Sequence, residues 1–160
     1  MPIFQFEYEE FQNLDELNPS YQQLLTAARN ACDHAHAPYS PFFVGSAVQL
    51  KNGRIVTGFN IENASYPVGI CAERTALASA IAQFPDEQIL ALAISYQSEI
   101  HPSDRPAFPC GMCRQFISEC EDRNKGEFPL ILAGEKGPVV VVKTIKDLLP
   151  FYFGGKDLSK

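Results

Sequence analysis

The sequence predicts an α/β domain in which helices cover a mixed β-sheet. The predicted elements follow the order helix, hairpin, helix, strand, helix, strand, strand, helix, and this alternation is typical of a sheet packed between helices. The chain has 160 residues, which suits one domain, and 46% of them are apolar, which is enough to fill a core.

The first helix follows an opening segment, residues 1–17, whose alternating aromatic and polar residues predict a strand or an extended arm. Asn18 suits the N-cap of this helix, and Pro19 suits its first position. Apolar residues then recur at helical spacing, so the helix has one buried face. It should end before Pro38, because the residue that precedes a proline is biased away from helix.

The central elements are separated by turn signals. Residues 42–50 and 55–63 are expected to form a hairpin, because an Asn-Gly pair between them favours a tight turn. An alanine-rich helix is predicted over 71–84. The apolar run at 88–96 is expected to be a strand covered on both faces.

The last third of the chain begins with a loop, residues 97–109, that contains three prolines. Its predicted elements are a helix over 110–120, strands over 128–133 and 139–144, and a short final helix over 145–149. Thr144 is expected to cap the final helix.

The charge and hydropathy of the chain exclude several classes of function. The net charge is −6 and no run of basic residues occurs, so a surface that follows a nucleic acid polymer is not expected. No apolar stretch approaches the roughly 18 residues of a membrane span, and the acidic start lacks the features of a secretory signal. We therefore expect a cytoplasmic protein.

Five cysteines point to metal binding or catalysis. Their odd number in a chain of cytosolic character disfavours a framework of disulfides. Cys110 and Cys113 form a Cys-x-x-Cys pair, which alone fits a redox pair, a structural zinc site or chance. Cys71 lies at the start of another predicted helix. Three thiolates around tetrahedral Zn²⁺ leave one coordination position open for water, as in catalytic zinc sites.

The neighbours of Cys71 supply the remaining chemistry. Helix N-termini stabilise thiolates through free N–H groups and the helix dipole. Three thiolates overcompensate a divalent ion, so Arg74 is expected to withdraw charge from a ligand sulfur. Glu73 lies too close to Cys71 to be an unstrained fourth ligand, but it can exchange protons with a water and a leaving group.

A ligand-x-Glu unit followed by Pro-Cys-x-x-Cys is the signature of zinc nucleoside and nucleobase deaminases. Four stretches extend the match: "APYSPFFVGSA", "GFNIENASYP", "CAERTAL" and "PCGMCRQ", with "LLP" and aromatic residues near the end. On these motifs the chain resembles the small homotetrameric cytidine deaminases over roughly residues 19–153.

The resemblance implies a three-layer α/β/α sandwich with a five-stranded mixed sheet. It implies hydrolysis of cytidine and deoxycytidine to uridine and deoxyuridine in pyrimidine salvage, with one Zn²⁺ per subunit. It also implies a homotetramer with active sites at subunit interfaces. Residues 1–17 are then an N-terminal extension, and residues 18–160 are a single catalytic domain.

The resemblance also assigns roles to residues of this chain. Cys71, Cys110 and Cys113 hold the zinc, Glu73 shuttles protons, and Arg74 compensates charge. It implies that Asn60 and Glu62 contact the ribose 3′-hydroxyl of the substrate. It implies that Phe42 stacks on the pyrimidine and that the Ala72 N–H faces the base carbonyl. Phe153 is expected to enter the site of a neighbouring subunit, with Phe151 as the alternative.

Two other interpretations stay open at this point. The same zinc chemistry could act on a modified nucleoside or an aminonucleoside antibiotic, and the extended 97–109 loop before the zinc cysteines could alter the substrate range. Alternatively, the chain could be a structural zinc protein or a non-catalytic nucleoside-binding module. A fourth protein ligand, such as a histidine, would then close the metal site.

Overall fold

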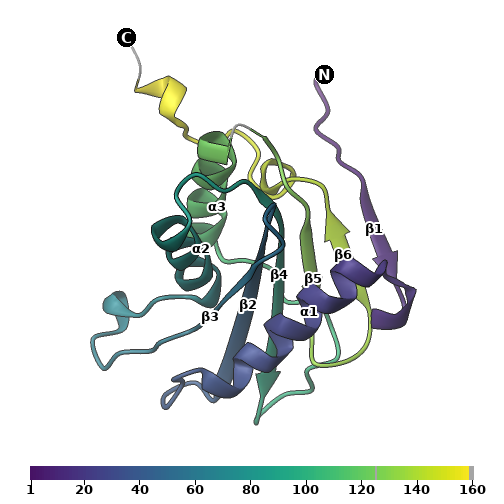
Figure 1. Cartoon of the computed structure of the whole chain (residues 1–160), viewed down its shortest axis with the longest axis vertical. Coiled ribbons are helices and arrows are strands. Elements are labelled where there is room, and N and C mark those ends of the chain that lie inside the picture. Colours follow the sequence, from purple (N-terminus) through teal and green to yellow (C-terminus); the bar gives the residue numbers. More distant parts are fainter. Residues whose placement is uncertain (125, 159–160) are drawn as a thin grey trace.

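A computed structural model describes residues 1–124 and 126–158, and it confirms the predicted fold class (Figure 1). The sheet is mixed, with strand order β1-β6-β5-β4-β2-β3; β4 and β5 are parallel, and the other neighbours are antiparallel. Its strands are β1 (Tyr8–Phe11), β2 (Phe42–Leu50), β3 (Ile55–Phe59), β4 (Ile89–Ser98), β5 (Leu130–Ala133) and β6 (Val139–Val142).

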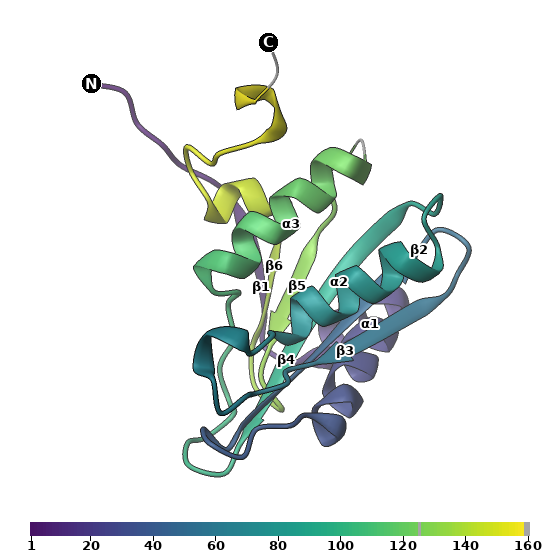
Figure 2. The ribbon, with the colours of Figure 1, turned by 90° about the vertical axis from the view of Figure 1, so that its left-hand side faces the viewer.

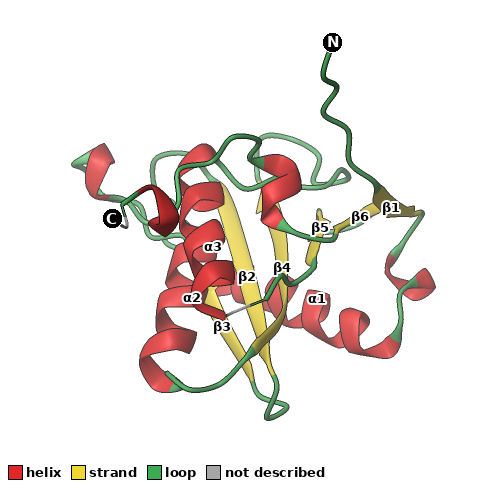
Figure 3. Ribbon diagram, turned by 90° about the horizontal axis from the view of Figure 1, so that it is seen from above, coloured by secondary structure: helices red, strands yellow, loops and turns green. Residues whose placement is uncertain are grey.

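Three α-helices cover the two faces of this sheet. Helix α1 (Pro19–Ala31) lies on one face, while α2 (Ala72–Gln83) and α3 (Gly111–Asn124) lie side by side on the other. The three layers are visible in Figures 2 and 3. In the described part of the chain, no helix has the length and apolar character needed to cross a bilayer.

The sheet has six strands, where the resemblance implies five. The extra strand is β1, which pairs antiparallel with β6 and places Tyr8 opposite Val142. Without it, β6 would expose a row of backbone N–H and C=O groups at the edge of the sheet. Part of the opening segment 1–17 is thus built into the sheet.

The capping residues act as expected. Asn18 accepts a hydrogen bond from the Tyr21 N–H at 3.0 Å, and Pro19 begins α1. Thr144 caps the helix predicted after β6, but that segment is a 3₁₀ helix, Ile145–Leu148, rather than an α-helix, and another 3₁₀ helix, Gly155–Asp157, follows it.

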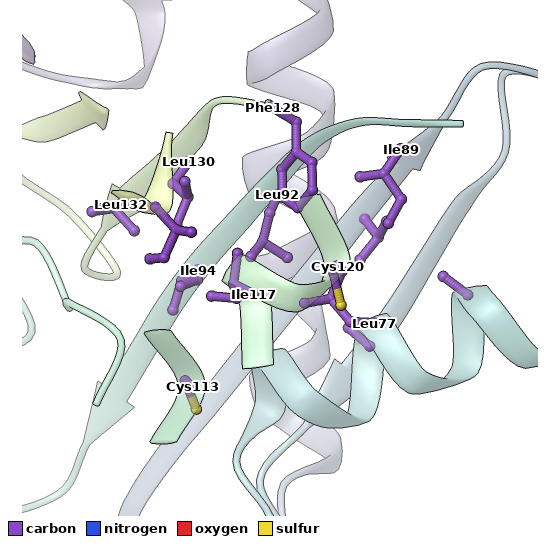
Figure 4. Packing of buried hydrophobic residues seen from close by; sticks show 14 of the residues in the cluster. Leu77, Ile89, Leu92, Ile94, Cys113, Ile117, Cys120, Phe128, Leu130 and Leu132 are labelled. Carbon is purple, nitrogen blue, oxygen red and sulfur yellow. The ribbon is translucent and has the colours of Figure 1, made fainter. Parts of the chain in front are cut away.

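Two hydrophobic clusters, one on each face of the sheet, form the core. Along β4, Leu92 and Ile94 face α2 and α3, while Ala91 and Ala93 face α1. This period of two explains the continuous apolar run of the strand. Figure 4 shows side chains of the larger cluster, including Cys113, Ile117 and Cys120 from α3, packed above β4 and β5. Cys113 thus anchors the start of α3 to the core.

Glycines allow two helices to lie unusually close to the sheet. A Cβ atom on Gly45 of β2 would lie 2.0 Å from the Ala28 carbonyl oxygen in α1. A Cβ atom on Gly58 of β3 would lie 2.3 Å from the Ala76 nitrogen in α2. The second contact sets the distance between β3 and the helix that begins next to Cys71.

Gly58→Ala is therefore expected to lower the free energy of unfolding by about 2–3 kcal/mol, because a methyl group forced against rigid backbone overpacks the interface. Chemical denaturation followed by circular dichroism at fixed protein concentration measures the change. Gly155→Ala is the control, because a Cβ at Gly155 meets no atom within 4 Å. Equal stability of the two variants would contradict this account of the α2–β3 contact.

Candidate metal centre and active site

Two helix N-termini bring three cysteine sulfurs together. Cys71 is the N-cap of α2, and its carbonyl accepts a hydrogen bond from the Thr75 N–H at 3.1 Å. The Cys110 carbonyl accepts the matching bond of α3 from the Arg114 N–H at 2.9 Å. Cys113 follows in the first turn of α3. The two helices therefore start at one place and direct their free N–H groups toward it.

The sulfur geometry fits a zinc ion. The Sγ atoms of Cys71 and Cys110 lie 3.9 Å apart, and those of Cys110 and Cys113 lie 3.5 Å apart. Ligands at 2.3 Å around a tetrahedral zinc are separated by about 3.8 Å, so these two pairs of sulfurs are already spaced as zinc ligands. All three Sγ atoms lie within 4.8 Å of one another. All three are free cysteines. No histidine joins this group among residues 1–124 and 126–158, so a fourth protein ligand of that kind is not available there.

The pKa values of the clustered thiols depend on one another. Hydrogen bonding by Cys113 and then by Arg74 lowers the pKa of the Cys71 thiol to about 5, against the opposing effect of burial. The presence of Cys71, together with burial, raises the pKa of Cys113. A divalent cation between the sulfurs would favour the thiolate form of each of them.

Arg74 lies beside the sulfur cluster, one helical turn from Cys71. Its Nη2 donates to the Gly69 carbonyl at 3.2 Å and to the Cys71 Sγ at 3.9 Å. Its Nε is buried and has no hydrogen-bond partner in the described part of the chain. The guanidinium is thus placed to offset the excess negative charge of three thiolates.

Glu73 is a buried carboxyl group next to the sulfurs. Only 5% of its surface is exposed, and burial raises the pKa of its carboxyl to about 6. A carboxyl group with a pKa near neutrality can both accept and return a proton, which is what general acid–base catalysis requires.

Glu73, Cys71 and Cys110 border a cleft of about 690 Å³. The other lining residues are Ser40, Phe42, Val44, Asn60, Glu62, Ile94, Tyr96, Arg105, Pro106, Ala107 and Phe108. The lining residues come from β2 and the residues before it, from β4, from the segment after β3, from the start of α2 and from the loop before α3.

The polar side chains after β3 are held by the segment around the start of β2. The Asn60 Oδ1 accepts from the Val44 N–H at 2.8 Å, and its Nδ2 donates to the Phe42 carbonyl at 2.9 Å. Glu62 accepts from the N–H groups of Tyr39 and Ser40 and from the Ser40 hydroxyl. Burial raises the pKa of Glu62, but these hydrogen bonds outweigh it and lower the pKa overall.

The cleft thus collects most of the residues expected from the sequence. Phe42, Asn60, Glu62 and Glu73 line it together with two of the cysteines. Ala72 is buried at the first position of α2, where its N–H has no partner within the helix. Phe153 lies outside the cleft of its own chain, where its carbonyl accepts from the Gln115 Nε2 at 2.7 Å.

Three of the lining residues that were not expected contribute an aromatic ring or a charge. The Tyr96 ring stacks on Phe42, with centroids 4.7 Å apart, and its period-two spacing from Ile94 could have placed it on this face. Arg105 and Phe108 come from the loop 97–109. No sequence pattern indicated that their side chains turn toward the cleft.

Comparison with known proteins decides the family. A model described as the cytidine and deoxycytidylate deaminase zinc-binding region matches residues 19–125. The chain belongs to the cytidine and deoxycytidylate deaminase family. A cytidine deaminase from Halalkalibacterium halodurans is 37% identical over 139 residues, which cover 86% of this chain and 97% of that protein.

The family resemblance extends to a solved structure and to a second activity. The crystal structure of a cytidine deaminase from Burkholderia pseudomallei matches with a TM-score of 0.71 and 36% identity, and the match covers 86% of this deaminase-family chain and 100% of that one. A blasticidin-S deaminase from Bacillus cereus is 36% identical over 112 residues, 69% of this chain and 76% of that protein. In the chain described here, Cys71, Cys110 and Cys113 are the residues that could hold the zinc ion of the family's zinc-binding region.

Proposed function

We propose that this chain is a zinc-dependent deaminase that hydrolyses cytidine and deoxycytidine to uridine and deoxyuridine and releases ammonia. The observation that carries the proposal is the position of the buried Glu73 beside three converging sulfurs at the edge of the cleft. The close similarity to cytidine deaminases over most of the chain supports it. The reaction would serve pyrimidine salvage in the cytoplasm.

The reaction exchanges an amine for an oxygen at C4 of the base. Zinc held by Cys71, Cys110 and Cys113 would supply Lewis acidity that makes water a nucleophile at neutral pH. Glu73 takes one proton from the attacking water as the C–O bond forms at C4 and delivers it to the ring nitrogen N3. It then takes the second proton, from the new C4 hydroxyl, and delivers it to the exocyclic amine, so that the bond between C4 and this amine breaks, C4=O forms and ammonia leaves.

Side chains at the other end of the cleft recognise the sugar. Asn60 can donate to the ribose 3′-hydroxyl and Glu62 can accept from it, which rewards a nucleoside over a free base. Phe42, supported by Tyr96, stacks on the pyrimidine, and the Ala72 N–H faces the base carbonyl. Arg74, which does not line this cleft, balances the charge of the zinc cluster.

Glu62→Gln is expected to raise KM for cytidine about tenfold, because the 3′-hydroxyl of the substrate loses its charged acceptor. Its kcat should change less, since Glu62 does not touch the reacting atoms. Steady-state kinetics with cytidine measure both constants, and Glu7→Gln, on the exposed opening segment, is the matched control. An unchanged KM in Glu62→Gln would show that Glu62 does not contribute to substrate binding.

We also propose a homotetramer in which the aromatic tail of one subunit completes the site of another. Phe151 is fully exposed and Phe153 is 58% exposed, and neither lines the cleft of its own chain. Phe153 is our choice for the residue that enters, with Phe151 as the alternative. Sedimentation should give a mass near four chains; the mass of one chain would contradict the assembly.

The function is tested by incubating the zinc-loaded protein with cytidine and following uridine by absorbance. A parallel panel should include deoxycytidine, free cytosine and blasticidin S, because the similarity to a blasticidin-S deaminase makes an aminonucleoside the second candidate substrate. Turnover of cytidine and deoxycytidine with little turnover of blasticidin S is expected. Zinc binding without turnover of any member of the panel would favour a structural or non-catalytic protein instead.

A further inference from the structure

Arg114 is a half-buried arginine near the metal centre to which the proposed reaction gives no role. It is the fourth residue of α3 and directly follows Cys113. No carboxylate among residues 1–124 and 126–158 forms an ion pair with its guanidinium. Its side chain instead donates to two backbone carbonyls, those of Pro109 and Leu148, at 2.9 and 2.8 Å. Arg114 therefore joins two segments that lie far apart in the sequence.

The first of these segments carries the sulfur that the core holds least. Cys113 is buried and Cys71 is half-buried, but Cys110 is exposed and lies just before α3. Arg114 holds this stretch twice, because its N–H donates to the Cys110 carbonyl at 2.9 Å and its Nε donates to the carbonyl of Pro109. The peptide between Pro109 and Cys110 is planar, so a bond that fixes its carbonyl also fixes the direction in which Cys110 follows.

The second segment is the C-terminal one, residues 145–158, which begins with a 3₁₀ helix beside α3 (Figure 2). The Arg114 Nη1 donates to the carbonyl of Leu148, the last residue of that helix, where carbonyls lack a partner within the helix. Gln115, the next residue of α3, donates from its Nε2 to the Phe153 carbonyl at 2.7 Å. Adjacent residues of α3 thus attach the C-terminal segment at two points.

The geometry of the guanidinium makes the two attachments depend on each other. Nε and Nη1 belong to one rigid plane, so the carbonyls that they hold keep a fixed relation to each other. Displacement of Pro109 would bend or lengthen the bond to Leu148, and displacement of Leu148 would do the same to the bond to Pro109. A lysine ammonium on its flexible stem cannot impose this relation.

We propose that Arg114 is a positioning residue that couples the zinc site to the C-terminal segment. It keeps Cys110 in place for the metal, and bound metal in turn strengthens the docking of residues 145–158 on α3. This inference rests on the proposed function, because the zinc is the ion that the reaction uses. Coupling is reciprocal, so whatever the docked segment adds to zinc affinity, zinc must add to the docking of the segment.

The first measurement is the zinc affinity of Arg114→Gln, determined by competition with a chelator at fixed protein concentration. The dissociation constant should rise about 10- to 100-fold, as is typical when a group that orients a metal ligand is removed. Co²⁺ bound in place of zinc should also give a changed visible spectrum, because the spectrum reports the arrangement of sulfurs around the metal. A general loss of stability would leave the spectrum of the folded protein unchanged.

Arg29→Gln is the matched control. Arg29 is also half-buried, and its Nε also donates to a backbone carbonyl, that of Gly134 at 3.1 Å, but it lies in α1 on the other face of the sheet. Its zinc affinity and Co²⁺ spectrum should equal those of the wild type. Arg114→Lys keeps the charge without the fork of donors and should recover little zinc affinity. Full recovery in Arg114→Lys would overturn the proposed bridge.

Hydrogen exchange followed by mass spectrometry tests the reciprocal effect. In the wild type, zinc should slow exchange in residues 145–158 about tenfold more than in α1, which serves as the reference for a general change in stability. In Arg114→Gln, exchange in this segment should be faster and insensitive to zinc. The wild-type comparison needs no variant, so it remains decisive if Arg114→Gln does not fold.

The coupling requires both effects. Absence of zinc-dependent protection in the wild-type C-terminal segment would overturn it, and so would weakened zinc binding in Arg114→Gln with unaltered exchange. Neither readout requires turnover. A wild type that binds zinc but converts no cytidine would refute the proposed deaminase function and leave both measurements valid. An active wild type, with Arg114→Gln binding zinc equally tightly, would refute only the positioning role.

Discussion

Glu73→Gln should lower kcat for cytidine by about 10³-fold, because a positioned general acid–base group contributes roughly 10²–10⁴-fold and here serves several proton transfers. An amide keeps the size of the carboxyl group but cannot exchange the proton. KM should change little, since Glu73 acts on the reacting atoms rather than on the sugar. Rapid-mixing or steady-state kinetics, with zinc measured in the same samples, would establish the effect.

Glu121→Gln is the matched control for this change. Glu121 is also buried, but it lies in α3 outside the cleft and accepts hydrogen bonds from the Thr144 hydroxyl and the Ile145 N–H. Its replacement should affect stability and leave kcat of the folded protein near the wild-type value. If Glu73→Gln kept wild-type kcat, proton transfer would have to be assigned to another group.

The zinc cluster was predictable because its residues are placed by local rules. A cysteine at each of two helix starts, with Glu73 two residues after one of them, fixes the chemistry wherever the helices lie. Only their meeting at one point depends on the tertiary fold. That meeting follows from placing α2 and α3 on the same face of the sheet, which the alternation of helices and strands favours but does not determine.

The order of the strands in the sheet was harder to predict from the sequence than the individual strands. Each strand has its own signal, such as the run of Val139–Val142 or the Asn-Gly turn before β3. The pairing of β1 with β6 joins segments more than 120 residues apart in the sequence, as Tyr8 opposite Val142 illustrates. Nothing in a short polar-aromatic segment specifies which distant edge it will cover, so a strand or arm could be expected there but its place in the sheet beside β6 could not.

The residues that form the walls of the cleft were likewise hard to predict from the sequence. Tyr96 could have been placed by its strand period, but the backbone at Arg105 is placed by contacts of its loop with the turn after β5. Glu62 was expected to bind the sugar, whereas its hydrogen bonds to Tyr39 and Ser40 depend on how two loops meet. Side chains set by loop–loop contacts have no periodic signature in the sequence.

The second prediction with a large expected effect concerns the loss of bound zinc. Cys110→Ala should abolish stable zinc binding and reduce activity by at least about 10³-fold, because the loss of one of three thiolates removes both affinity and the charge that holds the ion. Cys110 is the informative choice, since it is exposed and its removal leaves no cavity in the core. The measurements are zinc content after dialysis and turnover of cytidine.

Cys120→Ala is the control, because Cys120 lies in α3, the helix that follows Cys110, but is buried in the core and is not part of the cluster. It should retain one zinc per chain and lose only a modest part of its stability. A chelator should then lower the Tm of the wild type and of Cys120→Ala, because bound metal stabilises the native state, and leave the Tm of Cys110→Ala unchanged. Full zinc occupancy in Cys110→Ala would mean that the ion is held by other groups and that the two helix N-termini do not meet around a metal.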